Sequence, residues 1–87
     1  MLPSEDPLMR TGFSARQGQY LAFIYYYSKI NRRPPAEADI HRYFEVSAPA
    51  VHQMVVALES RGFIQRTSGQ ARSIRLLVPR SELPDLD

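Results

Sequence analysis

The sequence contains no cysteine, and this absence excludes disulfide bonds and thiolate chemistry. It also has no apolar run approaching the ~20 residues that a membrane-spanning helix needs. The first residues carry Glu5 and Asp6, where a secretory signal would be positively charged and then apolar. These absences predict a cytoplasmic protein, and 87 residues suffice for one small domain with a single core.

Signatures of catalysis and metal binding are missing as well. The two histidines, His41 and His52, fall in separate predicted helices, and neither G-x-S-x-G, H-E-x-x-H nor a Gly-rich phosphate loop occurs. A zinc site needs several convergent ligands, and the histidines have no ligand spacing with Asp39 or Glu45. We therefore expect that the protein is not an enzyme and that it binds neither a cofactor nor a metal ion.

What the sequence does have is an uneven distribution of charge. The span from Arg10 to Arg80 holds all eleven basic residues but only four of the nine acids, so its net charge is +7. Ten of these cations are arginine, and Lys29 is the single lysine. Arginine makes planar, multi-donor contacts with phosphates and base edges, so this bias favours a nucleic-acid surface over ordinary solvated charge.

Three segments differ in composition. Residues 1–12 mix proline, glycine and acids without periodicity, which predicts a flexible lead-in. Residues 13–79 carry the periodic apolar patterns of a folded domain. Residues 80–87 form an acidic tail after Pro79, which we expect to be frayed.

The first predicted helix begins at Ser14, because Gln17 three residues later completes the pattern of a capping box. It should end near Asn31, since Pro34 and Pro35 force extended backbone. Its expected buried stripe has three- and four-residue spacing and consists of Tyr20, Leu21, Ile24, Tyr27 and Ser28.

Two shorter helices follow, separated by a turn over residues 45–47. The first spans residues 36–44, and the second is capped by Ser47 and ends before Gly62. The expected inward residues are Ile40, Tyr43 and Phe44 in the former and Val51, Met54, Val55 and Leu58 in the latter.

A basic hairpin completes the pattern, with strands over residues 63–66 and 73–78 and Gly69 at the tip of the loop between them. The predicted fold class is therefore α+β, mainly α: a three-helix winged helix-turn-helix with a C-terminal two-stranded β wing. Such folds place one helix in a DNA groove.

The third helix leaves small and polar residues for its outer face. Gln53 suits a bidentate pair with adenine, His52 suits a purine N7 or O6, and Ala50 suits a thymine methyl group. The alternative is a solvent face without a readout role. Val56 is apolar but falls outside the core stripe, and we expect it to pack under the wing.

Three arginines bracket the wing loop: Arg66, Arg72 and Arg75. On a β-ribbon beside a recognition helix they suit phosphate clamping or minor-groove insertion. The alternative is a solvated edge hairpin whose charges prevent aggregation.

Four segments in order resemble the DNA-binding domain of the LexA repressor family. They are FSARQ at residues 13–17, RRPPAEADI at 32–40, VSAPAVHQMVVALESRGFI at 46–64 and SGQARSIRLL at 68–77. The resemblance implies base readout by Ser47, Pro49, Ala50, His52 and Gln53, and backbone contact by Arg61, Ser68, Gly69 and Arg72. Two departures affect local structure: Ala36 stands where the family has Ser or Thr, and Ser73 where it has Gly.

The resemblance implies a sequence-specific regulator of transcription, LexA-like and a repressor, that binds double-stranded DNA in the bacterial cytoplasm in association with the nucleoid. The 87 residues hold no Ala-Gly cleavage site and no Ser-Lys peptidase domain, so self-cleavage is not expected and the chain is either a fragment or a stand-alone regulator. A homodimer or a partner protein would supply a second half-site, with the tyrosines at 25–27 and Val56 as candidate contacts. The alternative function is a winged-helix module for protein–protein interaction.

Overall fold

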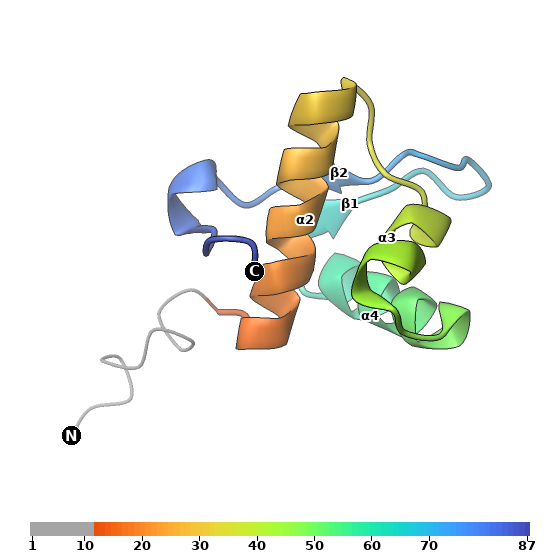
Figure 1. Ribbon diagram of the computed structural model, residues 1–87, viewed down its shortest axis with the longest axis horizontal. Coiled ribbons are helices and arrows are strands. Elements are labelled where there is room, and N and C mark those ends of the chain that lie inside the picture. The colour runs from red at the N-terminus through yellow and green to blue at the C-terminus, as the bar shows by residue number, and fades with distance from the viewer. Residues whose placement is uncertain (1–11) are drawn as a thin grey trace.

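Three helices precede a two-stranded antiparallel sheet in the computed structural model, which describes residues 12–87 (Figure 1). The elements are α2 (Ala15–Asn31), α3 (Glu37–Phe44), α4 (Ala48–Ser60), β1 (Ile64–Gln65), β2 (Arg75–Leu76) and the short 3-10 helix η2 (Arg80–Glu82). This order confirms the predicted winged helix-turn-helix. The predicted flexible lead-in lies, apart from Gly12, outside the described residues.

Local side-chain bonds explain where α2 begins and ends. The hydroxyl of Ser14 accepts a hydrogen bond from the Gln17 N–H at 3.0 Å, and the Gln17 side chain accepts one from the Ser14 N–H at 2.9 Å. This is the predicted capping box. At the other end Arg32 adopts a left-handed conformation with φ of 58° and its N–H donates to the Ser28 carbonyl.

Helix α3 keeps part of its N-terminal cap although Ala36 has no side-chain hydroxyl. The Asp39 carboxylate accepts a hydrogen bond from the Ala36 N–H at 2.8 Å, which is the half of a capping box that needs no side chain at the first position. In α4 the Ser47 hydroxyl accepts from the Ala50 N–H at 3.2 Å, as predicted. Gly62, with φ of 80°, then ends α4 in the left-handed conformation that favours glycine.

The core lies where α2, α3, α4 and the wing meet. Its buried apolar residues are Phe13, Tyr20, Leu21, Phe23, Ile24, Ile40, Val51, Val55, Leu58, Ile64 and Ile74. Two expectations for apolar residues were wrong. Tyr43 is 43% exposed, because it lies at the edge of the inward-facing stripe of α3 that Ile40 and Phe44 form. Val56 is 42% exposed on α4 and does not pack under the wing.

The strands are shorter than predicted. β1 and β2 pair through Ile64 with Leu76 and Gln65 with Arg75, and the Leu77 N–H donates to the Phe63 carbonyl at 2.9 Å. Beyond this ladder, the Ser73 hydroxyl accepts from the Thr67 N–H at 3.0 Å and hydrogen-bonds to the carbonyls of Thr67 and Gln70. Side-chain bonds thus replace strand pairing at the base of the loop, and Arg72, with a left-handed φ of 57°, lies in the loop ahead of the second strand.

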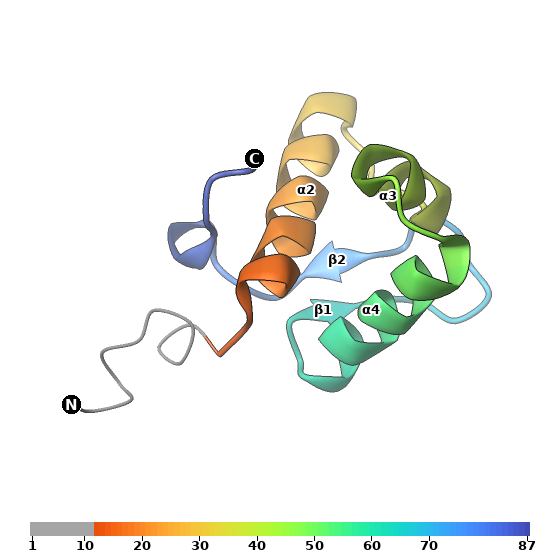
Figure 2. The same cartoon turned by 60° about the horizontal axis from the view of Figure 1, so that its bottom comes forward.

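The expectation of a frayed tail over residues 80–87 was also wrong. Leu83 and Leu86 pack against the core, and the Gln19 side chain donates to the Asp85 carbonyl and accepts from the Asp87 N–H, both at 2.8 Å. Two leucines at three-residue spacing supplied the apolar contact that a frayed segment would lack. Figures 1 and 2 show η2 on the side of α2 opposite α3 and α4, and at the end of the tail the Tyr43 hydroxyl of α3 donates to the Asp87 carbonyl at 2.6 Å.

Candidate nucleic-acid interface

The outer face of α4 is small and polar, while its inner face is fully buried. Val51, Val55 and Leu58 lie in the core with no exposed surface. The five residues predicted to read bases are all exposed and begin at the N-terminal end of this helix: Ser47, Pro49, Ala50, His52 and Gln53. The exposed Val56 lies one helical turn beyond His52 and Gln53 on the same face. The sequence pattern therefore predicted the two faces of α4 correctly.

Short side chains at the start of α4 leave its backbone open to close approach. Ala48, Pro49 and Ala50 form the first turn, and none extends beyond a few carbon atoms. The side chain of Gln53, in the next turn, forms no hydrogen bond within the described residues, so its amide is free for a ligand. This arrangement matches what the floor of a major groove requires of a reading helix.

His52 differs from Gln53 because its ring is already held. Its Nδ1 atom lies 3.2 Å from both carboxylate oxygens of Glu37, which begins α3. Glu37 in turn lies 3.5 Å from the Arg66 guanidinium, measured from Oε2 to Nη1. These contacts join α3, α4 and the end of β1 at one edge of the exposed face.

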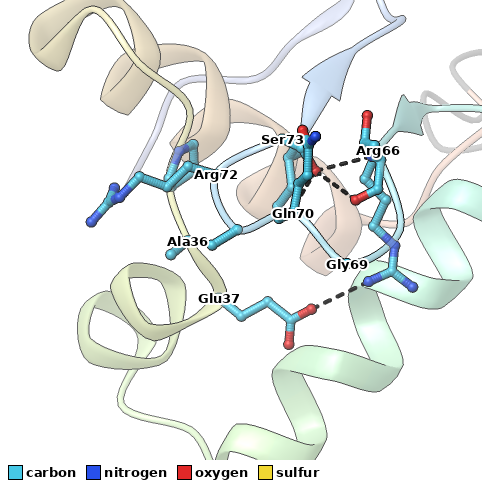
Figure 3. Close-up of a pocket in the computed structure, with 11 residues that line it drawn as sticks. Ala36, Glu37, Arg66, Gly69, Gln70, Arg72 and Ser73 are labelled. Atoms are coloured by element: carbon cyan, nitrogen blue, oxygen red, sulfur yellow. Dashed lines mark hydrogen bonds and ion pairs between the residues drawn. The ribbon is translucent and has the colours of Figure 1, made fainter.

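The wing loop and the start of α3 enclose a cavity of about 250 Å³, shown in Figure 3. Ser68 and Gly69 are exposed at the tip of the loop, and Gly69 has φ of 79° in a turn closed by the Gln70 N–H donating to the Thr67 carbonyl. Arg75 is exposed on β2, and its guanidinium hydrogen-bonds to the Gln65 side chain. The structure thus brings three of the predicted backbone contacts to the surface of the wing.

The other two wing arginines are bound to acids within the domain. Arg66 donates from Nε to Glu59 at 3.0 Å and also faces Glu37, so its side chain is only 27% exposed. Arg72 extends away from both Glu37 and Arg66 in Figure 3. Its Nη1 atom lies 2.9 Å from the Asp39 carboxylate and 3.0 Å from the Tyr27 hydroxyl.

These partners lie on α2 and α3, so Arg72 contacts the helices of its own domain. Its left-handed backbone turns the side chain toward α2 and α3 rather than toward solvent, and the guanidinium also reaches the Pro34 carbonyl at 3.4 Å. Asp39, only 11% exposed, is thereby paired with a cation. Arg72 therefore fastens the wing to the helices, and the phosphate-contacting role expected from the sequence does not fit this geometry.

Arg72→Ala and Asp39→Asn are both expected to lower the midpoint of thermal unfolding at neutral pH. Burial raises the pKa of Asp39, but the Ala36 N–H bond and the charge of Arg72 outweigh it, and the net pKa lies below the ordinary 3.8. The folded state therefore favours the ionised form. The stabilisation is present above the ordinary carboxyl pKa and is lost as the pH falls through the folded-state pKa.

Thermal melts followed by circular dichroism between about pH 7 and about pH 2 measure this effect. The difference between wild type and Asp39→Asn should shrink toward the acid end. A difference that stays constant over the whole range would contradict the ion-pair account.

Arg61, the remaining predicted backbone contact, lies at the opposite end of α4 from the small residues. Its Nη2 atom donates to the Gly12 carbonyl at 2.9 Å, and its guanidinium lies 5.5 Å from the centre of the Phe63 ring. At ~1.5 Å per residue, twelve residues place Arg61 about 18 Å along the helix axis from Pro49. The two ends of α4 could therefore contact different stretches of a duplex.

Sequence reasoning missed Glu37, Asp39 and Tyr27 as partners of the site residues. From the sequence, Asp39 was considered for a site only as a metal ligand, Tyr27 was placed in the buried stripe or at a contact with a partner, and Glu37 had no assigned role in a site. Their contacts with His52 and Arg72 span fifteen residues or more, and no local spacing signals such pairs.

The described residues contain no group of three acids or histidines that could hold a metal ion. Within the same residues, no buried side-chain nitrogen or oxygen lacks a hydrogen-bond partner. None of the helices in residues 12–87 has the length and apolar character to cross a membrane.

Three packed helices, a short basic wing and an outward face of small and polar residues define a winged helix-turn-helix DNA-binding domain. The family model for the LexA DNA binding domain matches residues 10–73. The chain belongs to this family.

Curated relatives agree with the family match. The chain is 33% identical over 63 residues to the LexA repressor of Thermotoga neapolitana, covering 72% of this chain and 32% of that protein. It is 37% identical over 67 residues to the LexA repressor of Thermosipho melanesiensis, covering 77% of this chain and 33% of that protein. For the LexA repressor of Actinobacillus pleuropneumoniae serotype 5b the identity is 30% over 76 residues, covering 86% and 36%. The chain thus spans about a third of the length of these relatives.

Proposed function

We propose that residues 13–79 of this chain bind double-stranded DNA in a sequence-specific manner and that the protein acts as a regulator of transcription, of the repressor type. One observation carries the proposal. Because one side of α4 is buried, its small residues and the side chains of His52 and Gln53, which can hydrogen-bond to bases, lie together on the exposed side. Relatives named as LexA repressors support the regulatory part. Binding to chromosomal DNA would also associate the protein with the bacterial nucleoid.

Base readout is assigned to the start and middle of α4. Small side chains at Pro49 and Ala50 would let the helix approach the groove floor, where Gln53 suits the paired donor and acceptor of adenine. Ser47 would serve at the N-terminal edge. We add Val56 to this face, because an exposed apolar side chain one turn further on suits a thymine methyl group.

Backbone contact is assigned to Arg75, Ser68 and Gly69 on the wing and to Arg61 at the end of α4. All four are exposed. Arg66 and Arg72 are assigned to the fold instead, since acidic side chains already neutralise them. The central net charge of +7 would supply the attraction to phosphates that does not depend on sequence.

One reading helix covers one half-site, so high affinity needs a homodimer or a partner protein. The exposed Ile30 and the tyrosines at 25 and 26 are candidate contacts on α2. The same scaffold could serve protein–protein interaction alone, but the concentration of arginines over residues 10–80 favours DNA.

Gln53→Ala and Arg75→Ala are expected to affect DNA binding in different ways. Selection from a random duplex pool would first supply a preferred duplex. Gln53→Ala should then lower the preference for this duplex over a scrambled one by about 1–3 kcal/mol, the usual value of a bidentate base contact. Arg75→Ala should weaken binding to both duplexes alike and reduce the salt slope by about one phosphate contact.

Fluorescence anisotropy with labelled duplexes over a series of salt concentrations measures both quantities. Equal losses of preference in the two variants would reject this division of roles. Binding that does not depend on salt, or no binding to any duplex at low salt, would contradict the proposed function itself.

A further inference from the structure

A chain of charged side chains runs from Glu59 near the end of α4, through Arg66 after β1 and Glu37 at the start of α3, back to the reading face of α4. Glu59 accepts from the Arg66 Nε atom at 3.0 Å, Arg66 lies 3.5 Å from Glu37, and Glu37 contacts His52 at 3.2 Å. The part of this chain that includes Glu37 and Arg66 is visible in Figure 3, where the two side chains point toward each other. His52, at the end of the chain, is the member with the most exposed side chain, at 56%.

The chemistry of this contact defines which ring nitrogen of His52 carries hydrogen. A carboxylate accepts hydrogen bonds and does not donate them, so the Nδ1 atom that faces Glu37 must be the donor. In a neutral imidazole the other nitrogen, Nε2, is then an acceptor. No hydrogen bond to Nε2 occurs within residues 12–87, which leaves this acceptor available to a ligand.

We propose that Glu37 is a positioning residue that presents Nε2 of His52 as a hydrogen-bond acceptor for an exocyclic amino group of a base. In the major groove such a group is N4 of cytosine or N6 of adenine. This inference rests on the proposed function and revises one part of it. A purine N7 or O6, which the sequence suggested for His52, accepts hydrogen bonds and would need a donor at Nε2.

Arg66 holds the Glu37 carboxylate in this orientation. Its guanidinium lies between Glu37 and Glu59 and is largely shielded from solvent, so one fixed cation offsets part of the charge of the two acids. Without that charge, the same acids would place more negative charge near the DNA phosphates. Arg66 therefore lowers the electrostatic cost of an acid beside the reading face.

The test uses base analogues at the base pair that His52 reads. That pair is identified as the position in the selected duplex where His52→Ala loses its preference. Replacing adenine with purine or cytosine with 2-pyrimidinone removes only the amino group. Wild-type affinity should fall roughly threefold to tenfold, the value of one hydrogen bond, and His52→Ala should be indifferent.

Glu37→Ala is the decisive variant, and Glu59→Ala is its matched control. Each substitution removes one negative charge and one ion pair of Arg66, but only Glu37 contacts His52. Glu37→Ala should lose the sensitivity to the missing amino group, because either ring nitrogen can then carry the hydrogen. Glu59→Ala should keep it. The ratio of affinities for two duplexes does not depend on the folded fraction, so a loss of stability alone would not produce this result.

Three outcomes would overturn the inference. One is wild-type binding that responds to 7-deazapurine but not to loss of the amino group, since Nε2 would then be a donor. Another is full sensitivity retained in Glu37→Ala, and the last is a His52→Ala variant that keeps the wild-type preference at every position. A wild-type chain without preference for any duplex would contradict the proposed function instead.

Discussion

Ala50→Glu is expected to reduce affinity for the preferred duplex by roughly 100-fold or more, because like charges brought together at an interface cost several kcal/mol. Ala50 is exposed in the first turn of α4, where the helix must come closest to the groove. A glutamate there adds bulk against the groove floor and a negative charge facing the phosphates. Electrophoretic mobility shift or anisotropy titration measures the loss.

The same substitution should not weaken the fold. Ser47 caps α4 and accepts from the Ala50 N–H, so a glutamate at position 50 completes the pattern of a capping box. Ser81→Glu is the matched control, since it adds the same charge in η2 on the other side of α2 (Figure 1). We expect it to reduce affinity only slightly, and equal losses in the two variants would contradict readout by α4.

Ile40→Ala is expected to destabilise the domain by about 2–5 kcal/mol, the usual cost of truncating a fully buried isoleucine. Ile40 has no exposed surface and belongs to the core that joins α3 to α2 and α4. In a domain of this size each kcal/mol lowers the melting temperature by about 4–8 °C. Urea and thermal unfolding measure the change.

Ile30→Ala in α2 provides the control, because its side chain is 76% exposed and surface changes usually stay within about 0.5 kcal/mol. In Ile40→Ala the apparent affinity for DNA should fall with the folded fraction, while the preference between two duplexes stays the same. A change in preference with an unchanged melting temperature would contradict a purely structural role for Ile40.

The helices and the two faces of α4 could be predicted because their causes are local. Ser14 with Gln17, and Ser47 ahead of Pro49, mark helix starts through bonds that span three residues. The three- and four-residue spacing of Val51, Val55 and Leu58 assigned the inner face, and the exposed candidates followed by exclusion. Such short-range patterns appear directly in the sequence.

The contacts of the wing and the packing of the tail could not be predicted in the same way, because they depend on residues far away in the sequence. Arg72 is a residue type that often contacts phosphates, but its partners Tyr27 and Asp39 lie 45 and 33 residues away in the sequence. Ser73 shortens the strands through bonds across the loop, and Gln19 fixes a tail 66 residues further on. A basic side chain alone does not indicate whether its partner is a phosphate or an acid of the same domain.

Readout of base sequence by the exposed face of α4 can be measured as a single ratio. This ratio is the dissociation constant of the wild-type chain for a scrambled duplex divided by that for the selected duplex, measured at near-physiological salt. We expect a ratio on the order of 1,000, the lower end of the range for specific DNA-binding proteins, because a single chain supplies one half-site. A ratio near one would contradict it and leave only attraction to phosphates.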